Sequence, residues 1–135
     1  MKKFTLDTNI ISYLLKGNKI IAAKIKEKLD NGDQIIINPI TYYEICRGLL
    51  AVNNTKKLEK FKEICKIFRV NQITEKTLYK AAEIYAYLRK KGKLIDDADI
   101  FIAAICIEED IILITNNEKH FLRIKELELE KWPED

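Results

Sequence analysis

Short apolar runs alternate along the chain with longer segments whose apolar residues recur at helical spacing. Residues 3–6 alternate apolar and polar side chains, whereas residues 34–38 and 111–114 are nearly continuous apolar runs rich in isoleucine. Alternation is typical of a half-buried strand, and a continuous run is typical of a strand buried on both faces. A weaker strand is predicted at residues 68–70. These runs indicate a parallel sheet that is covered by helices.

Between the strands, apolar residues recur every three or four positions, which predicts helices. The predicted helices cover residues 10–15, 19–29, 41–51, 55–67, a long segment led by Thr74 and Thr77, and 100–108. Gly92 ends the long helix, and Asp96 or Asp97 can cap the last one. Because strands alternate with helices, we expect an α/β fold with a central, mostly parallel sheet between two layers of helices.

The composition narrows the class of protein. A length of 135 residues has room for one hydrophobic core, so we expect a single domain over residues 1–135. No apolar run approaches the roughly 18 residues that a membrane span needs, and Asp7 and Asn9 interrupt the apolar start, unlike in a signal peptide. We therefore expect a cytoplasmic protein. The three cysteines lie far apart in apolar stretches, which predicts core packing and not disulfides or a zinc site.

The net charge of +3 is small, but basic residues are unevenly distributed. Two basic clusters stand out, whereas residues 126–135 form an acidic tail. The clusters consist of Lys56, Lys57, Lys60, Lys62, Lys66 and Arg69, and of Arg89, Lys90, Lys91 and Lys93. Taken alone, such runs favour solvated helix faces over a nucleic-acid surface.

Acidic residues stand where the predicted strands end. Asp7 follows the first predicted strand, and Glu44 lies in the helix after the second strand. Asp99 lies in the first turn of the helix that precedes the strand at residues 111–114. Ligands of open parallel sheets bind beyond the carboxyl ends of the strands, so these side chains can converge there with Thr115 and Asn117. Glu44 lies among apolar neighbours, which is uncommon unless a carboxylate is paired or bound to a ligand.

Several carboxylates in one pocket repel one another unless a divalent cation neutralises them. Because the candidate ligands are oxygens, with no His or Cys at ligand spacing, Mg²⁺ or Mn²⁺ is favoured over Zn²⁺. His120 is the only histidine and receives no catalytic role, since a lone histidine without a partner motif is more often structural.

Structural interpretations of the same residues remain open. Asp7 can cap the helix that begins near Asn9, and Asp96 or Asp97 can cap the helix that contains Asp99. Thr115 and Asn117 can simply start another helical turn. Asp99 keeps the stronger functional claim because it directly precedes the apolar sequence IFIAA.

Four segments occur in the order LDTNI, ITYYEICRG, IDDADIFIAAIC and LITNNEKHF. In this order and at these separations they resemble the PIN domain, and specifically VapC-type toxins of toxin–antitoxin pairs. The resemblance extends over essentially the whole chain, including the closing ELELEKW. It implies a central parallel sheet of about five strands with helices on both sides, in a three-layer α/β/α arrangement.

The resemblance also implies roles for individual residues. Asp7, Glu44 and Asp99 match the metal-binding acids of the family, and Thr115 matches the hydroxyl residue beside them. Thr8 and Asn9 are supporting positions in the first motif, and Asp96 and Asp97 stand beside the third acid. The family's fourth acidic position falls on Asn117 here, which puts a second metal ion in doubt.

The implied activity is Mg²⁺- or Mn²⁺-dependent hydrolysis of RNA phosphodiester bonds. The implied partners are an RNA substrate, a small protein antitoxin and a second copy of the chain in a homodimer. A helical stripe of Leu78, Ala81, Ala82, Tyr85 and Leu88 suggests a dimer surface or an antitoxin groove, although core packing also explains it.

Other functions stay open at this point. One alternative is a catalytically inactive PIN-like module that binds RNA or acts as a scaffold, which Asn117 favours. A phosphatase with Asp7 as nucleophile ranks low because Asn9 replaces the second Asp of the usual Asp-x-Asp motif. A structure-specific DNA nuclease ranks low because the chain is too short for the extra helical segments of those enzymes.

Overall fold

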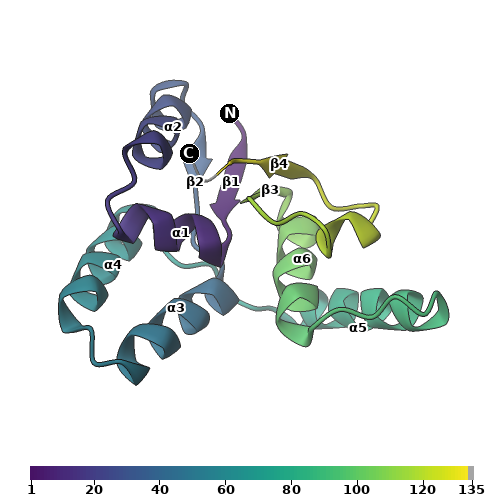
Figure 1. The fold of residues 1–135 in the computed structure, drawn as a ribbon. Helices are drawn as coiled ribbons and strands as arrows, with labels where there is room; N and C mark the ends of the chain where they lie inside the picture. Colours follow the sequence, from purple (N-terminus) through teal and green to yellow (C-terminus); the bar gives the residue numbers. More distant parts are fainter. Residues whose placement is uncertain (134–135) are drawn as a thin grey trace.

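A parallel sheet lies between two groups of helices in the computed structural model, which describes residues 1–133 (Figure 1). The strand order is β2-β1-β3-β4, and every neighbouring pair is parallel. The strands of the described residues are β1 (Lys3–Leu6), β2 (Gln34–Ile35), β3 (Ile111–Thr115) and β4 (Leu129–Lys131). The predicted α/β fold is confirmed, with four strands in place of about five.

The helices follow the strands in the predicted alternation. They are α1 (Thr8–Leu15), α2 (Lys19–Asp30), α3 (Pro39–Ala51), α4 (Thr55–Phe68), α5 (Glu75–Lys90), α6 (Asp97–Glu109) and the short 3₁₀ helix η1 (Phe121–Arg123). Figure 1 shows α1 to α4 on one side of the sheet, and α5 and α6 on the other. On the first side, the predicted cap of α4 at Asn54 is confirmed, because its side chain accepts the Lys57 N–H at 3.1 Å.

Two apolar cores form, one on each face of the sheet. Phe4 and Leu6 of β1 pack with α1, α2 and Phe61 of α4. Leu113 of β3 packs on the other face with α5 and α6. Such burial on both faces explains why β3 is a continuous apolar run in the sequence. The carboxyl ends of β1 and β3 are therefore held side by side, with Leu6 opposite Ile114.

The segment around Pro39 differs from its prediction. The strand expected over residues 34–38 ends at Ile35, and Ile37 makes an isolated parallel bridge to Val70. The strand expected at residues 68–70 is reduced to this bridge, because α4 continues to Phe68. The helix expected from Thr41 begins at Pro39, since proline is tolerated in the first helical turn.

The carboxyl-terminal part of the chain adds two elements that were not expected, η1 and β4. Leu129 of β4 pairs with Leu113 of β3, so this edge strand extends the sheet. The alternation Glu-Leu-Glu-Leu-Glu over residues 126–130 is a strand signal that the acidic composition obscured. The last two residues of the predicted acidic tail, Glu134 and Asp135, lie outside the described residues.

The predicted stripe on α5 divides into a buried and an exposed part. Ala81 and Leu88 are buried, together with Ile84. Leu78 and Tyr85 are 48% and 42% exposed, so core packing alone does not explain the predicted stripe. The buried positions recur every three or four residues on one face of the helix, and the exposed ones lie beside this face.

The remaining general expectations concern cysteines and membranes. Cys106 is buried in the core, while Cys46 and Cys65 are half-buried, and all three thiols are free. Burial, followed by the neighbouring Cys46, raises the pKa of the Cys65 thiol to about 11. Among residues 1–133, no helix combines the length and the apolar character needed to cross a bilayer.

Candidate metal centre

Asp7 lies at the carboxyl end of β1, where the chain turns into α1. Its backbone N–H donates to the Ile114 carbonyl oxygen of β3 at 2.8 Å, which fixes its position between the two central strands. Oδ1 accepts the Thr8 N–H at 2.9 Å, and Oδ2 accepts the Thr115 hydroxyl at 2.8 Å. Asp7 thus caps α1, and its side chain is also held toward β3. The residue is only 8% exposed.

Glu44 lies in the second turn of α3 and is connected to the first motif. The start of α3 is fixed by Asn38, whose side chain accepts the Ile40 N–H at 3.0 Å and donates to the Ile102 carbonyl oxygen of α6 at 3.4 Å. One carboxylate oxygen of Glu44 then accepts the Thr8 hydroxyl at 2.9 Å. Thr8 therefore joins two of the predicted acids, through its backbone to Asp7 and through its side chain to Glu44.

Thr115 ends β3 and organises the loop that follows. Its hydroxyl oxygen accepts the Asn117 N–H at 3.0 Å while the hydroxyl donates to Asp7. Asn116 donates from Nδ2 to the Tyr13 hydroxyl of α1 at 2.6 Å, which fastens the loop to that helix. Asn117, at the expected fourth acidic position, is exposed. The alternative that Thr115 and Asn117 start a helical turn does not hold, because the described residues 116–118 directly after β3 are not helical.

Asp99 lies in the first turn of α6 and is half-buried. Its Oδ2 is 3.4 Å from Nδ1 of His120, in the segment that leads into η1. Sequence reasoning gave His120 no role and did not connect these residues, which are 21 positions apart. The segment LITNNEKHF contains His120, so the family motif was the one available signal.

Asp96 and Asp97 stand apart from the three main acids. Both are exposed. Asp96 is the N-cap residue of α6, although its side chain accepts no capping hydrogen bond from the described part of the chain. Asp97 lines a groove between α5 and α6, together with Leu78 and Tyr85. The structure thus brings Asp96 near Asp99, whose pKa it helps to raise, and directs Asp97 toward the groove.

Burial and mutual repulsion shape the electrostatics of the cluster. Burial raises the pKa of Asp7 above its usual value, and the nearby charges of Asp99 and Glu44 raise it further, against the hydrogen bonds from Thr115 and Thr8. Burial likewise raises the pKa of Asp99, which His120 partly offsets. Three separate elements therefore bring negative charge into one region, and a cation there would relieve the repulsion.

The donor chemistry suits a hard divalent cation, although the ligand set is not closed. Within residues 1–133, no three acidic, histidine or cysteine side chains converge as a ready-made metal cage. Mg²⁺ typically binds one or two protein carboxylates and keeps several waters, so it does not require such a cage. Asn9, two residues after Asp7 in the first turn of α1, has a buried Oδ1 without a hydrogen-bond partner in the described residues. The oxygens present therefore fit Mg²⁺ or Mn²⁺.

Comparisons with known proteins agree with this arrangement. The family model of the PIN domain matches residues 4–127. Ribonuclease VapC1 of Haemophilus influenzae strain R2866 is 32% identical over 139 residues, covering 96% of this chain and 97% of that protein. Ribonuclease VapC1 of Methanocaldococcus jannaschii is 35% identical over 127 residues, covering 94% of this chain and 85% of that protein.

Solved structures share the same fold over nearly the full length. A structure of VapBC2 from Rickettsia felis, bound to a DNA fragment from its promoter, matches with a TM-score of 0.87 and 29% identity, covering 97% of this chain and 99% of that one. VapBC-1 from nontypeable Haemophilus influenzae matches with a TM-score of 0.85 and 29% identity, covering 96% and 98%. From its sequence motifs, its fold and these relatives, the chain belongs to the PIN domain family and, within it, to the VapC ribonucleases.

Proposed function

We propose that this chain is a Mg²⁺- or Mn²⁺-dependent endoribonuclease and the toxin of a VapBC-like pair, with Asp7, Glu44 and Asp99 at its catalytic centre. The observation that carries the proposal is the buried carboxylate of Asp7. It lies between the two central strands, is oriented by the Thr115 hydroxyl, and has a pKa raised by burial and by two neighbouring acids. A buried charge of this kind is costly for a fold, which is the usual mark of a functional position.

The chain's own residues divide the work. Asp7 and Asp99 would hold the ion, and Glu44 would bind it directly or through water. When bound, the ion lowers the pKa of a coordinated water and neutralises charge that builds on the phosphate oxygens. Thr115 keeps the Asp7 carboxylate in place, and Thr8 does the same for Glu44. Such supporting hydrogen bonds commonly change activity by about 10- to 100-fold when they are removed.

Asn117 occupies the position where the family resemblance implies a fourth acid. Its side chain is exposed, and its backbone is held by Thr115. An amide oxygen can still accept a hydrogen bond from a water or contact an ion, but it adds no negative charge. We therefore propose one tightly held ion at this centre.

The proposed partners follow from the relatives. The compared structures named VapBC contain a VapC-like chain, and we infer that this chain likewise pairs with a small protein antitoxin. We also propose a homodimer, for which the exposed Leu78 and Tyr85 on α5 offer apolar surface. RNA would be met in the cytoplasm, the location that we propose for the chain.

The alternative function is an inactive module that binds RNA or acts as a scaffold, and two observations support it. Asn117 replaces an acid, and the described side chains do not form a closed metal cage. RNA binding without cleavage, in the presence of either Mg²⁺ or Mn²⁺, would support this alternative.

The test is cleavage of total cellular RNA by the purified chain, with the new ends mapped. Cleavage is expected with Mn²⁺ and is expected to stop reversibly with EDTA. Asp7→Asn and Asp99→Asn should abolish it, while Asp110→Asn is the matched control. Asp110 is exposed at the opposite end of α6 in the left-handed region, which asparagine tolerates. Full cleavage by Asp7→Asn or Asp99→Asn would refute the proposed centre.

A further inference from the structure

The end of α5 and the segment around η1 enclose a cavity of about 240 Å³ in which every charged side chain is basic. We call it the basic pocket, and define it by Tyr87, Lys91, Lys93, Leu122, Arg123 and Lys125. The first of the two basic clusters in the sequence lies on α4, away from this pocket. The pocket combines Lys91 and Lys93 of the second cluster, at the end of α5, with Arg123 and Lys125, which follow His120. Residues 30 positions apart in the sequence thus form one positively charged hollow.

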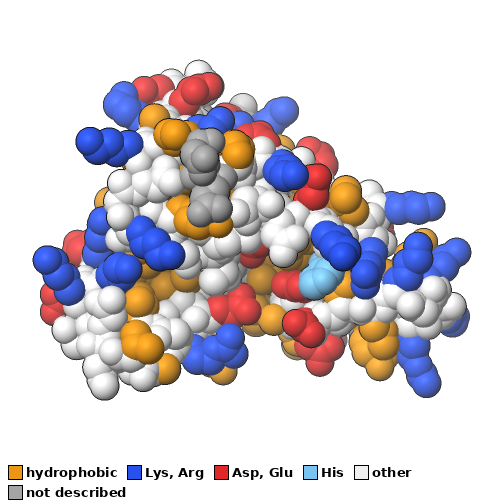
Figure 2. Space-filling model, in the orientation of Figure 1, with side chains coloured by type: hydrophobic (Ala, Val, Ile, Leu, Met, Phe, Trp, Pro, Cys, Tyr) orange, Lys and Arg blue, Asp and Glu red, His pale blue; other side chains and the backbone are white. Residues whose placement is uncertain are grey.

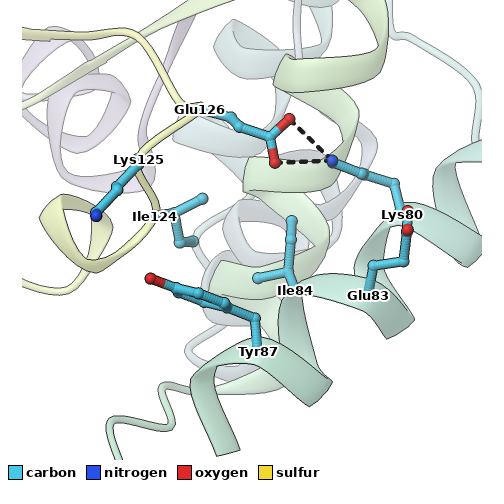
Figure 3. Close-up of a pocket in the computed structure, with 7 residues that line it drawn as sticks. All are labelled: Lys80, Glu83, Ile84, Tyr87, Ile124, Lys125 and Glu126. Atoms are coloured by element: carbon cyan, nitrogen blue, oxygen red, sulfur yellow. Dashed lines mark hydrogen bonds and ion pairs between the residues drawn. The ribbon is translucent and has the colours of Figure 1, made fainter. Parts of the chain in front are cut away.

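Among residues 1–133, the cations of the basic pocket form no ion pair with an acidic side chain. In the part of the chain that the structure describes, none of the four has a carboxylate oxygen within 4.0 Å. Glu126, beside Lys125 in the sequence, is instead bound by Lys80 at 2.8 Å. Figure 3 shows Glu126 turned toward Lys80 in the neighbouring groove, while Lys125 points away from this pair. Four like charges without counterions are a natural site for phosphate groups.

Arg123 gives the pocket a fixed wall. Its Nη1 donates to the carbonyl oxygens of Lys93 and Leu94, at 3.3 and 3.1 Å. These bonds fasten η1 to the residues after α5, so Lys93 and Lys125 are presented from segments that are held together. The cations of the basic pocket are therefore held at defined positions relative to one another, unlike lysines scattered on a surface.

Exposed apolar groups lie among these cations. Tyr87 is 44% exposed and Leu122 is 63% exposed. The Lys91 amino group lies 5.7 Å from the centre of the Tyr87 ring. Proteins that bind single-stranded nucleic acid combine positive charge for the phosphates with aromatic faces on which bases stack. Double-stranded RNA offers no such unstacked bases.

Asp7, Glu44 and Asp99 together are called the acidic centre here. The basic pocket is close to this centre along the chain. η1 begins directly after His120, whose ring lies against Asp99. In Figure 2, lysine and arginine side chains gather around the single histidine, next to acidic side chains on the same face. One RNA strand could therefore contact both places.

We propose that the basic pocket binds the backbone of single-stranded RNA beside the cleavage point, with Lys93 and Lys125 on phosphates and Tyr87 against a base. The proposal rests on the proposed ribonuclease function and names the part of the surface that holds the substrate. It assigns this role to the pocket and not to the basic face of α4, where Glu63 pairs with Lys66 at 3.0 Å.

The experiment measures binding of a fluorescently labelled, single-stranded RNA of mixed sequence to the full chain in EDTA, over a range of salt concentrations. The double variant Lys93→Ala/Lys125→Ala is compared with Lys62→Ala/Lys66→Ala on α4. Each lost phosphate contact should lower the slope of log affinity against log salt by about 0.7, and at 0.1 M salt it should weaken binding about fivefold. The pocket variant should therefore bind on the order of twentyfold more weakly, while the α4 variant stays near wild type.

Two controls separate binding from folding and stacking from charge. Cations at a helix end can stabilise the helix, so melting temperatures are compared, and they should be nearly equal. Tyr87→Ala should weaken RNA binding several-fold, and Tyr87→Phe should restore it because the ring is kept.

A pocket variant that binds RNA like wild type, or an α4 variant that loses as much RNA affinity as the pocket variant, would overturn the proposal. Binding of poly-L-glutamate is measured in the same way. If the pocket variant loses this binding while its RNA binding is unchanged, the pocket binds an acidic polypeptide, and the proposal is overturned. Because EDTA prevents metal-dependent cleavage, binding is read independently of whether the acids are catalytic.

Discussion

The acidic centre and the basic pocket use charge in opposite ways. Asp7 is almost buried, and each of its carboxylate oxygens accepts a hydrogen bond. Lys93 and Lys125 are exposed and have no carboxylate partner among residues 1–133. The acids come from the ends of strands and the starts of helices, whereas the cations come from a helix end and the segment beyond it. Buried charge at fixed positions suits a small ion, and several exposed charges of one sign suit a long polyanion.

This difference has an energetic consequence. Burying the acids costs free energy in the folded state, and a bound cation would offset that cost. Exposed lysines are already hydrated, so they neither add nor remove much stability. Substitutions should therefore affect the two regions differently: acidic ones should change both chemistry and stability, and basic ones should change RNA binding alone.

The largest expected effect is that of Asp7→Asn on cleavage. The amide can accept the Thr8 N–H and donate to the Thr115 hydroxyl oxygen, so the fold should be kept while the charge is lost. The cleavage rate should fall on the order of a thousandfold or more, as is usual when a central catalytic group is removed. Single-turnover cleavage of one mapped RNA measures this, with circular dichroism as the folding control.

The next effect concerns the hydroxyl that orients Asp7. Thr115→Val should lower cleavage by about 10- to 100-fold and should destabilise the fold by roughly 1 to 3 kcal/mol, because Asp7 and the Asn117 N–H both lose a partner. Thr115→Ser keeps the hydroxyl and should retain most activity. Equal rates for the valine and serine variants would show that the hydroxyl has no part in the reaction.

The pH dependence of stability distinguishes the two regions further. Burial raises the pKa of Asp7 in the folded chain above the unfolded value of 3.8, so the folded state holds its proton to higher pH. Asp7 therefore contributes stability that is fully present below pH 3.8 and is lost as the pH rises through the folded pKa. Without metal, Asp7→Asn should melt a few degrees higher than wild type at pH 7, and the gap should close near pH 4. Thermal melts in EDTA at several pH values measure it, and a gap that widens toward pH 4 would contradict the raised pKa.

The smallest expected effect is that of removing the basic pocket's lysines on the free energy of unfolding. Lys93→Ala/Lys125→Ala should change the free energy of unfolding by only about 0.5 kcal/mol, because exposed and unpaired side chains contribute little. Urea denaturation measures the difference. A large loss would mean that these lysines mainly stabilise the end of α5.

Much of the acidic centre could be predicted from the sequence because its residues stand next to strong backbone signals. The alternation of residues 3–6 and the apolar run before Thr115 predicted β1 and β3, and strands in parallel register bring Asp7 and Thr115 together. The metal-binding roles of Asp7, Glu44 and Asp99 were inferred from their places near the strand ends and from the family motifs, and they remain predictions. The acidic tail obscured β4, whose Glu-Leu alternation is a strand signal.

Contacts between distant segments could not be read from one sequence. The approach of His120 to Asp99 depends on how the loop after β3 packs, which no local pattern specifies. The basic pocket depends on the bonds from Arg123 to the residues after α5, so charge runs alone could not reveal it. The extent of β2 was overestimated because Pro39 fits the first turn of α3, and the helix therefore starts two residues early.

The most direct test of the acidic centre is calorimetric titration of Mn²⁺ into the wild-type chain, Asp7→Asn and Lys93→Ala/Lys125→Ala. The wild type and the lysine variant should bind the ion alike, and Asp7→Asn should lose most of the binding heat. Binding of Mn²⁺ by Asp7→Asn with wild-type affinity would contradict a metal centre built on this carboxylate.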